Sequence, residues 1–381
     1  MSSPIRAARW HSVQVTSKTC WSFVELEDAS GRFGLGEATL AGREGVMRPL
    51  FDRRKEDVVG RAPEAVDLAP ARAAAGSLPD FAVVSALDLA VHDLRAQGAG
   101  TSLARLLGGK RRESVKVYAN VNRGTVLRTP EAFAERAARA VADGFRAIKI
   151  APFDGVELYG EPDRKADPAR IDAALARIAA VRGAVGASVD LMVDCHWRLN
   201  RAAAESVVRA IEPYRLYWLE CPVPETPEML ETIRALRAAL NGRGVRLAGC
   251  EEMSMVRGFL PFLEAGAYDV MMPDVKYVGG VEEMLAVAEA LARRGVGFSP
   301  HNPSGPVCHA ASLQIGSAVA GFELLEMQYA ETPLFDELVA GALPKVADGQ
   351  LRAPDAPGLG VRLDQALVQR LRTPEHDRPR A

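Results

Sequence analysis

The chain has 381 residues, of which 48% are hydrophobic and 25% are charged, the composition of a soluble globular protein larger than one ordinary domain. Its 47 basic and 49 acidic residues leave a net charge of -2, which excludes a general electrostatic attraction to nucleic acid. No apolar run is long enough for a membrane helix and residues 1–16 lack the core of a signal peptide, so we expect a cytoplasmic protein without membrane partners.

The first part of the chain has the pattern of an α+β unit. Residues 24–27 alternate apolar and acidic side chains, which predicts a half-exposed strand. A turn at residues 28–31 and a return strand beginning at residues 33–35 follow. From residue 44 to 109 the apolar side chains recur at helical spacing, so the strands of this part precede its helices.

From residue 114 the pattern changes to short apolar strands that alternate with helices. Eight strands are predicted, at residues 115–121, 147–150, 191–194, 216–220, 245–251, 270–272, 297–299 and 322–326. Helices are predicted between most of them, for example at residues 130–142, 168–181, 201–211 and 281–293, with Thr129 as an N-cap. Short strands without alternation are typical of a parallel sheet covered by helices. Eight of them, with no G-x-G-x-x-G motif, favour a closed barrel over an open dinucleotide-binding sheet.

Six acidic or imidazole side chains occur at or just beyond the predicted strand ends, spaced 23 to 31 residues apart. They are Asp194, Glu220, Glu251, Asp274, His301 and Glu326. In an eight-stranded parallel barrel the strand carboxyl ends converge on one face, which brings such residues together. An enzyme active site is therefore the first hypothesis.

Asp194, Glu220 and Glu251 would end three consecutive strands. Three carboxylates in one place repel one another unless a cation lies among them, and ligation by oxygen alone favours Mg²⁺ over zinc. Glu252, beside Glu251, leaves the choice of the third ligand open.

The five cysteines show no C-x-x-C spacing, which also argues against zinc. Three of them, Cys195, Cys221 and Cys250, lie next to the candidate metal ligands. A thiol nucleophile is one interpretation, and small buried side chains near strand ends are the other.

Two histidines are candidates for proton transfer. His301 follows the seventh strand and Asp274 the sixth, so the carboxylate can hold the imidazole tautomer and favour its protonated form, although His301 could instead brace a turn. His196 is two residues beyond Asp194 and should face the same mouth, roughly opposite His301. A substrate between them could lose a proton to one and receive one from the other, unless His196 only bonds within its loop.

Further candidates surround this set. Lys149 lies within an apolar strand, where its charge is costly unless it faces an anion such as a substrate carboxylate. Asn120, Asn122 and Arg123 end the first strand and could bind substrate hydroxyls, and a neutral Glu326 could donate a hydrogen bond to an oxyanion. Structural roles are open for each of them.

Several motifs together resemble the mandelate racemase group of the enolase superfamily. They are ALDLAVHDL (86–94) with LLGG (106–109), WLECPVP (218–224), PDV (273–275), GG (279–280) and HNPSGP (301–306). The resemblance covers about residues 36 to 326. It implies a (β/α)7β TIM-like barrel at residues 114–334 and an α+β capping domain at 1–113, completed by about 335–381. It also implies one Mg²⁺ on Asp194, Glu220 and Glu251, which stabilises an enediolate formed by removal of the α-proton of a carboxylate.

One departure changes the expected reaction. Mandelate racemase carries two lysines separated by one residue at the end of strand two, whereas Ala151 stands at the second position here. Asp194-Cys195-His196 is similar to the sugar-acid dehydratases of the group. The resemblance therefore implies that His301 removes the C2 proton of an aldonate or aldarate and that His196 protonates the departing C3 hydroxyl. The product would be a 2-keto-3-deoxy acid, as in carbohydrate catabolism.

Other functions remain open at this point. The same enediolate would serve an epimerase, a racemase or a cycloisomerase, and a catalytically silent binding paralogue is an alternative of another class. Specificity would depend on loops of the cap at residues 15–21 and 41–52, where Trp21 and Arg43 line the pocket or lie exposed. We expect a homo-oligomer and a frayed end at residues 373–381.

Overall fold

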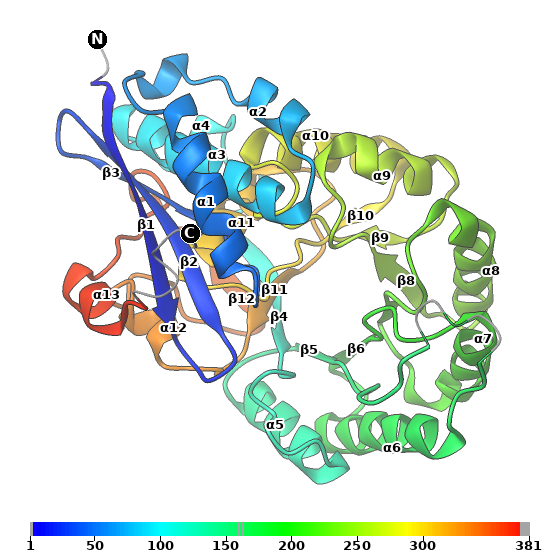
Figure 1. The fold of residues 1–381 in the computed structure, drawn as a ribbon. Helices are drawn as coiled ribbons and strands as arrows, with labels where there is room; N and C mark the ends of the chain where they lie inside the picture. Colours follow the sequence, from blue (N-terminus) through cyan, green and yellow to red (C-terminus); the bar gives the residue numbers. More distant parts are fainter. Residues whose placement is uncertain (1–2, 159–160, 162–163, 374–381) are drawn as a thin grey trace.

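The computed structural model describes residues 3–158, 161 and 164–373; most of the predicted frayed end, residues 374–381, lies outside this part of the chain. Figure 1 shows a capping domain beside a ring of strands and helices. The cap begins with an antiparallel sheet in the order β1 (Ile5–Gln14), β2 (Cys20–Asp28), β3 (Phe33–Glu37). Its helices follow as α1 (Glu44–Arg54), η1 (Lys55–Asp57), η2 (Pro63–Ala65), α2 (Ala69–Ala74), α3 (Leu78–Gly98) and α4 (Leu103–Leu106).

Helix α3 forms the core of the cap. It begins at Ser77, whose side chain accepts the N–H of Asp80, and it packs against β3. The approach is close enough that a Cβ added at Gly36 would lie 1.9 Å from the Ala86 carbonyl oxygen. Only glycine fits there, so this residue sets the distance between helix and sheet.

The prediction of a half-exposed strand at residues 24–27 is wrong, because every residue of β2 is buried. Val24 and Leu26 of β2 pack in the core that α3 helps to form. Glu25 and Glu27 on the other face are covered by arginines of β1, with Arg9 Nη1 3.3 Å from Glu25 Oε1 and Arg6 paired with Glu27. Alternation therefore indicated the strand correctly, but ion pairs rather than solvent cover its polar face.

The barrel strands form one parallel sheet in the order β10-β9-β8-β7-β6-β5-β4-β11. They are β4 (Ser114–Asn120), β5 (Ala147–Ile150), β6 (Asp190–Asp194), β7 (Trp218–Glu220), β8 (Arg246–Gly249), β9 (Val270–Met271), β10 (Gly297–Phe298) and β11 (Leu325–Gln328). A parallel bridge between Phe298 and Phe322 brings the two ends of the sheet together. The predicted α/β barrel with an α+β cap is thus confirmed.

Helices cover the outside of this sheet, as Figure 1 shows for α5 to α9. They are α5 (Pro130–Ala142), α6 (Pro168–Val185), α7 (Arg201–Ala210), η3 (Glu212–Tyr214), η4 (Pro227–Met229), α8 (Leu230–Asn241), α9 (Met255–Glu264), α10 (Val281–Arg294) and α11 (Pro306–Ala318). The predicted N-cap is confirmed, since the Thr129 side chain accepts the N–H of Ala132. Among the described residues, no helix is both long and apolar enough to span a membrane.

Two predicted strands differ from the structure in ways that matter for the site. The fifth ends at Gly249, so Glu251 lies in the loop beyond β8 and not on the strand. The last begins at Leu325 rather than at residue 322, because the segment before it contributes only the bridge at Phe322. Glu326 is therefore the second residue of β11, opposite Tyr118 of β4.

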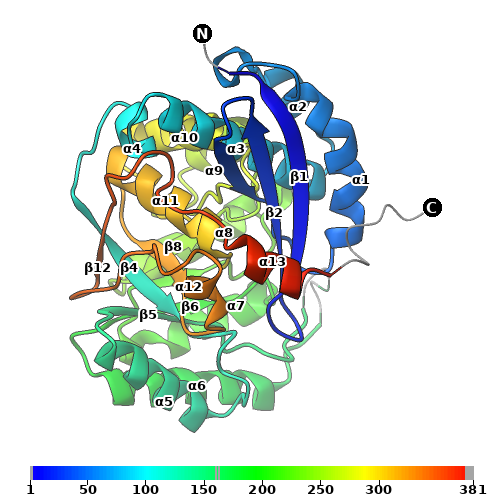
Figure 2. The same cartoon turned by 90° about the vertical axis from the view of Figure 1, so that its left-hand side faces the viewer.

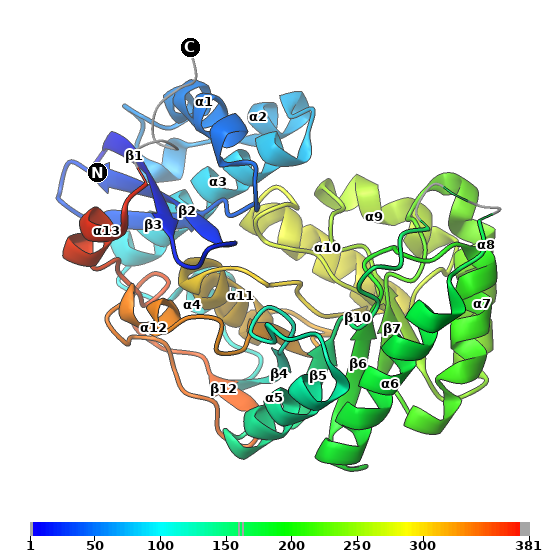
Figure 3. The same cartoon turned by 60° about the horizontal axis from the view of Figure 1, so that its bottom comes forward.

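The end of the chain contacts both parts of the molecule. After α12 (Leu334–Glu337), β12 (Gln350–Arg352) pairs antiparallel with β4, so this segment extends the barrel sheet. Helix α13 (Gln365–Leu371) then packs against β1, and an isolated bridge joins Val13 to Arg372. Figures 2 and 3 both show α13 beside the cap sheet.

Asp93 of α3 ties the chain end to the cap. Its two carboxylate oxygens accept the N–H groups of Leu35 (2.9 Å) and Leu359 (2.8 Å). Burial raises the pKa of Asp93 to about 6 despite these hydrogen bonds. A carboxyl group whose folded-state pKa is raised stabilises the fold below pH 4, and this contribution is lost as the pH rises through 6.

We therefore expect the stability of the wild-type protein, relative to Asp93→Asn, to fall by roughly 3 kcal/mol between pH 4 and pH 7. Urea unfolding at several pH values measures this difference. Asp88, buried on the same helix, is the matched control: burial opposes its charge, but His92, Arg72 and the N–H of Val281 lower its pKa overall. The difference between wild type and Asp88→Asn should therefore rise as the pH rises toward 4 and change little from pH 4 to pH 6. Equal slopes for the two variants would contradict this account.

Candidate active site

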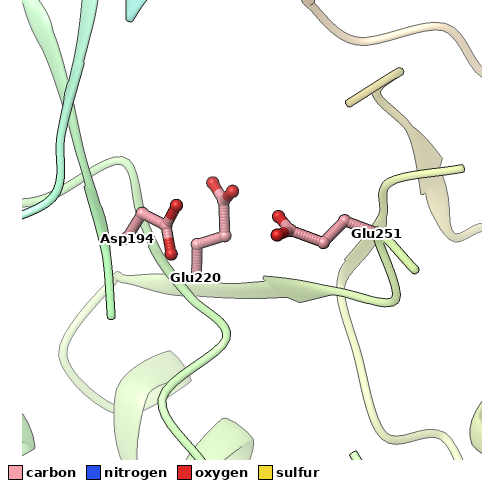
Figure 4. Close-up of side chains that lie close together, drawn as sticks. All are labelled: Asp194, Glu220 and Glu251. Carbon is pink, nitrogen blue, oxygen red and sulfur yellow. The ribbon is translucent and has the colours of Figure 1, made fainter. Parts of the chain in front are cut away.

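Three carboxylates meet at the mouth of the barrel, as Figure 4 shows. Asp194 ends β6, Glu220 ends β7 and Glu251 follows β8. All three are buried, and each offers an oxygen within 4.8 Å of the oxygens of the other two. The predicted grouping of these residues is present in the structure, and Glu251 rather than the exposed Glu252 belongs to it.

The electrostatics of this group fit a bound cation. Burial raises the pKa of Glu220 to about 7, and the charges of Asp194 and Glu326 add to this effect. The ammonium of Lys149 opposes it but does not outweigh it. Burial and the charges of Asp194 and Glu220 likewise raise the pKa of Glu251 well above its usual range. Glu251 Oε2 is buried without a hydrogen-bond partner. Oxygen ligands, crowded negative charge and an orphaned acceptor are what a hard divalent cation requires.

Lys149 is buried beside this group, with Nζ 2.6 Å from Glu220 Oε1 and 3.0 Å from Glu326 Oε1. Its ammonium also lies over the ring of Tyr118, 5.3 Å from the centroid. The anions that satisfy Lys149 in this structure are therefore protein carboxylates. The sequence predicted a substrate carboxylate in that place.

Glu326 does not fit the neutral hydrogen-bond donor that the sequence suggested. Burial opposes its charge, but Lys149, His301 and hydrogen bonds from Asn302 and Asn120 outweigh burial and lower the pKa of Glu326 to about 2. Asn120 Nδ2 donates to Glu326 Oε1 at 2.7 Å and the Asn302 N–H donates to Oε2 at 2.8 Å. Glu326 is thus an ionised acceptor that holds Lys149 and Asn120.

His301 lies beside Asp274 as predicted, with Nδ1 2.8 Å from Asp274 Oδ2. This contact leaves Nε2 facing the carboxylate group, 3.6 Å from Glu251 Oε2. Asp274 itself raises the pKa of His301, as expected. Burial lowers the pKa of His301, and it outweighs the opposing effect of Asp274. The imidazole is therefore a neutral ring with a free Nε2 acceptor, the form that a general base needs.

His196 reaches the same mouth from the loop after β6. Its ring Nε2 is 2.9 Å from Asp194 Oδ2, and its backbone N–H donates to Asp194 Oδ1 at 2.8 Å. The charge of Asp194 raises the pKa of His196. The side chain is 39% exposed, so the ring borders open space as well as Asp194.

A cavity of about 410 Å³ joins these groups. Its barrel side includes Asn120, Asn122, Arg123, Lys149, Asp194, His196, Glu251, His301 and Glu326. Its cap side includes Thr19, Cys20, Thr39, Leu40 and Ala41. Residues from both predicted domains therefore enclose one polar pocket of a size suited to a small metabolite.

The structure corrects the prediction that Trp21 lines this pocket. Trp21 is 1% exposed and packs edge-on against Phe23 and Phe335 in the core. Successive side chains of a strand point to opposite faces, and here Cys20 faces the pocket while Trp21 faces the core. Arg43 is exposed and lies outside the wall of the pocket.

The three predicted hydroxyl-binding residues do border the pocket, but each also has a protein partner. Asn120 donates to Glu326, the Asn122 side chain accepts from Arg128 Nη2 at 2.6 Å, and Arg123 Nη1 is 3.6 Å from Glu331 Oε2. Their role toward a substrate stays a prediction.

All five cysteines are buried thiols. Burial raises the pKa of Cys195, Cys221 and Cys250 well above the usual range, and the neighbouring carboxylates add to this. Because the thiolate is the reactive form, these positions do not suit a nucleophile, and the interpretation as buried side chains near strand ends holds.

Sequence reasoning missed Lys276. This lysine is buried, lines the pocket and pairs with Asp274 Oδ2, the oxygen that also contacts His301. Its ammonium lies 3.9 Å from the ring centroid of Tyr277. The signal was available in Pro273-Asp274-Val275-Lys276, where a lysine follows a candidate catalytic carboxylate by two residues.

Comparison with known proteins agrees with this arrangement. The model of the enolase C-terminal domain-like family matches residues 132–367, and that of the mandelate racemase/muconate lactonizing enzyme N-terminal domain matches residues 2–108. A D-gluconate dehydratase of Thermoproteus tenax is 31% identical over 98% of this chain and 72% of its own length. A D-galactonate dehydratase of Ralstonia nicotianae is 30% identical over 91% of this chain and 90% of its own.

Solved structures show the same fold. A mandelate racemase/muconate lactonizing enzyme from Jannaschia sp. CCS1 superposes with a TM-score of 0.87 at 26% identity, covering 97% of this chain and 98% of that one. An enolase from Agrobacterium radiobacter, solved with bound sodium and L-malate, gives a TM-score of 0.83 at 26% identity over 97% and 95% of the two chains. The chain therefore belongs to the mandelate racemase/muconate lactonizing enzyme family of the enolase superfamily.

Proposed function

We propose that this protein is a Mg²⁺-dependent dehydratase of a sugar acid, an aldonate or an aldarate, and hence a lyase. The observation that carries the proposal is one pocket lined by Asp194 and Glu251 of the three grouped carboxylates, by a histidine that a carboxylate holds, and by a second histidine on another loop. The names of the relatives, D-gluconate and D-galactonate dehydratase, support the same reaction class.

Asp194, Glu220 and Glu251 would hold the cation, which would supply positive charge to the carboxylate oxygens of the substrate as the C2 proton leaves. Lys149 lies in the same wall and adds a second positive charge near that position. Glu326 and Glu220 hold the ammonium of Lys149 in place, so this charge is preorganised.

His301 Nε2 would remove the C2 proton. Asp274 holds Nδ1–H, so the basic lone pair is on Nε2, the atom that faces the carboxylate group. The C2–H electrons form the enediolate, and their return expels the C3 hydroxyl. His196 would donate the proton that lets this hydroxyl leave as water. The resulting enol then becomes the 2-keto-3-deoxy acid.

The experiment that tests this function is a screen of aldonates and aldarates with Mg²⁺, read out as 2-keto-acid formation. The same incubations in deuterated water distinguish the reaction classes. Deuterium at C2 of recovered or epimerised substrate, without any 2-keto product from the panel, would show that the enzyme exchanges the proton and does not dehydrate.

Lys276 offers a further prediction. Lys276→Met should lower kcat/KM by about 100-fold, because a buried Asp274 without its ammonium partner no longer holds His301 in one geometry. Lys276→Arg keeps the charge and should retain much more activity. Steady-state kinetics of the two variants measure this, with circular dichroism to establish that both fold. Equal activity of Lys276→Met and wild type would remove Lys276 from the catalytic arrangement.

A further inference from the structure

We infer that Glu225 is a positioning residue that fixes the three loops beside the cation ligands, those after β6, β7 and β8. Glu225 lies in the loop between β7 and η4, and it is not itself close enough to belong to the ligand group. The inference rests on the proposed cation site but not on the proposed reaction.

One oxygen of Glu225 accepts hydrogen bonds from more than one donor. Oε1 accepts the N–H of Cys250 at 2.6 Å and the hydroxyl of Tyr268 at 2.7 Å, and the Cys221 Sγ lies 4.0 Å away. The side chain of Trp197 also hydrogen-bonds to this carboxylate. The donors come from the loops after β6, β7 and β8, together with Tyr268, which precedes β9.

One cation ligand lies within three residues of each contact that Glu225 makes with these loops. Trp197 is three residues beyond Asp194, Cys221 directly follows Glu220, and Cys250 directly precedes Glu251. A shift of any one of these contacts therefore moves the start of a ligand side chain.

The backbone at the three contacts is strained. Of the nine non-glycine residues with positive φ in the described part of the chain, three are Trp197 (56°), Cys221 (44°) and Cys250 (70°). For non-glycine residues this conformation costs on the order of 1 kcal/mol or more each and persists only where the surroundings hold it. The carboxylate of Glu225 accepts the backbone N–H of Cys250 and contacts the side chains of Trp197 and Cys221, so it helps to hold all three residues in place.

The surrounding structure is shaped around this contact. A Cβ added at Gly249 would lie 2.4 Å from Glu225 Oε1 and 2.7 Å from the Tyr268 ring, so glycine is required where β8 ends. The loops are also joined directly, since the N–H of Trp197 donates to the Cys221 carbonyl at 2.7 Å and that of Cys221 to the Ala248 carbonyl at 3.1 Å. Glu225 thus joins these loops in one network of hydrogen bonds.

The test compares Glu225→Leu, which removes the acceptors, with Glu225→Gln, which keeps one acceptor oxygen and the side-chain shape. Mg²⁺ binding without substrate is measured by titration calorimetry. We expect Glu225→Leu to weaken Mg²⁺ affinity at least about tenfold, as for other groups that orient metal ligands, and Glu225→Gln to restore most of it. Asp93→Ala is the control, because it removes a buried carboxylate of the cap, destabilises the fold and should leave the affinity unchanged.

A second measurement does not need the cation. Hydrogen exchange in EDTA should show faster exchange at the Cys250 amide and its neighbours in Glu225→Leu but not in Glu225→Gln. Wild-type affinity and wild-type exchange in Glu225→Leu, or an equal loss of affinity in Asp93→Ala, would overturn the inference. If Glu225→Leu does not fold, Tyr268→Phe replaces it, and unchanged affinity and exchange in that variant would have the same meaning. If the wild-type protein itself binds no Mg²⁺, the proposed function fails while the exchange data still decide the role of Glu225.

Discussion

His301→Asn is expected to abolish both 2-keto-acid formation and exchange of the C2 proton, with a loss of at least about 1,000-fold in each. His301 is the imidazole whose Nε2 faces the carboxylate group while Asp274 holds its other nitrogen. Asparagine fills similar space and can still bond Asp274, but its side chain is not a base. Because proton removal precedes the departure of the hydroxyl, no later step can proceed. Product formation and loss of deuterium from C2-labelled substrate measure the two effects separately.

His196→Asn should separate these two effects. Without the acid the C3 hydroxyl cannot leave readily, so dehydration falls by about 100-fold or more, while His301 still removes and returns the C2 proton. The same variant keeps an amide near Asp194, which limits damage to the ligand group. If both variants still dehydrated the substrate, the assignment of base and acid would be wrong. If His196→Asn lost exchange as well, His196 would have a role in proton removal or in holding Asp194.

The barrel and its mouth could be predicted from sequence because they follow from local patterns. Short apolar runs predicted all eight barrel strands to within three residues of their observed bounds, and a parallel barrel brings strand ends together whatever its details. Asp194, Glu220 and Glu251 therefore met as expected. The prediction of a cation site rested only on the number of negative charges, since three carboxylates do not pack together unless something neutralises them.

The remaining features depend on long-range contacts that a pattern does not contain. Trp21 and Cys20 differ by one position on a strand, and only the packing of β2 decides which of them faces the pocket. The charge of Glu326 depends on Lys149, which approaches from a strand far away in sequence. The pKa of His301 depends on how deeply the fold buries the imidazole.

The loops beyond the strands were the least predictable part. Glu225 follows a recognisable motif, but its role depends on backbone strain in three loops that converge only in the fold. Lys276 was detectable beside Asp274, yet the sequence does not show that its ammonium shares an oxygen with His301.

Glu251→Gln should have opposite effects with and without Mg²⁺. In EDTA, burial and the charges of Asp194 and Glu220 oppose ionisation of Glu251, and its Oε2 accepts no hydrogen bond. A neutral amide has neither this repulsion nor the need to take up a proton, so the free energy of unfolding should stay equal or rise by about 1 kcal/mol. With Mg²⁺ the variant lacks one of three anionic ligands, so the affinity should fall about 100-fold or more and dehydration should be lost.

Denaturant unfolding in EDTA and in Mg²⁺, together with titration calorimetry, measures this reversal. Glu252→Gln is the matched control, because Glu252 is the neighbouring residue, lines the same cavity and is exposed. It should change neither the stability in EDTA nor the Mg²⁺ affinity by a comparable amount, since water already solvates its charge. The opposite assignment, with affinity lost in Glu252→Gln and kept in Glu251→Gln, would make Glu252 the third ligand. Loss of stability in EDTA for Glu251→Gln would mean that Glu251 stabilises the fold itself, and the crowded carboxylates would then no longer argue for a cation.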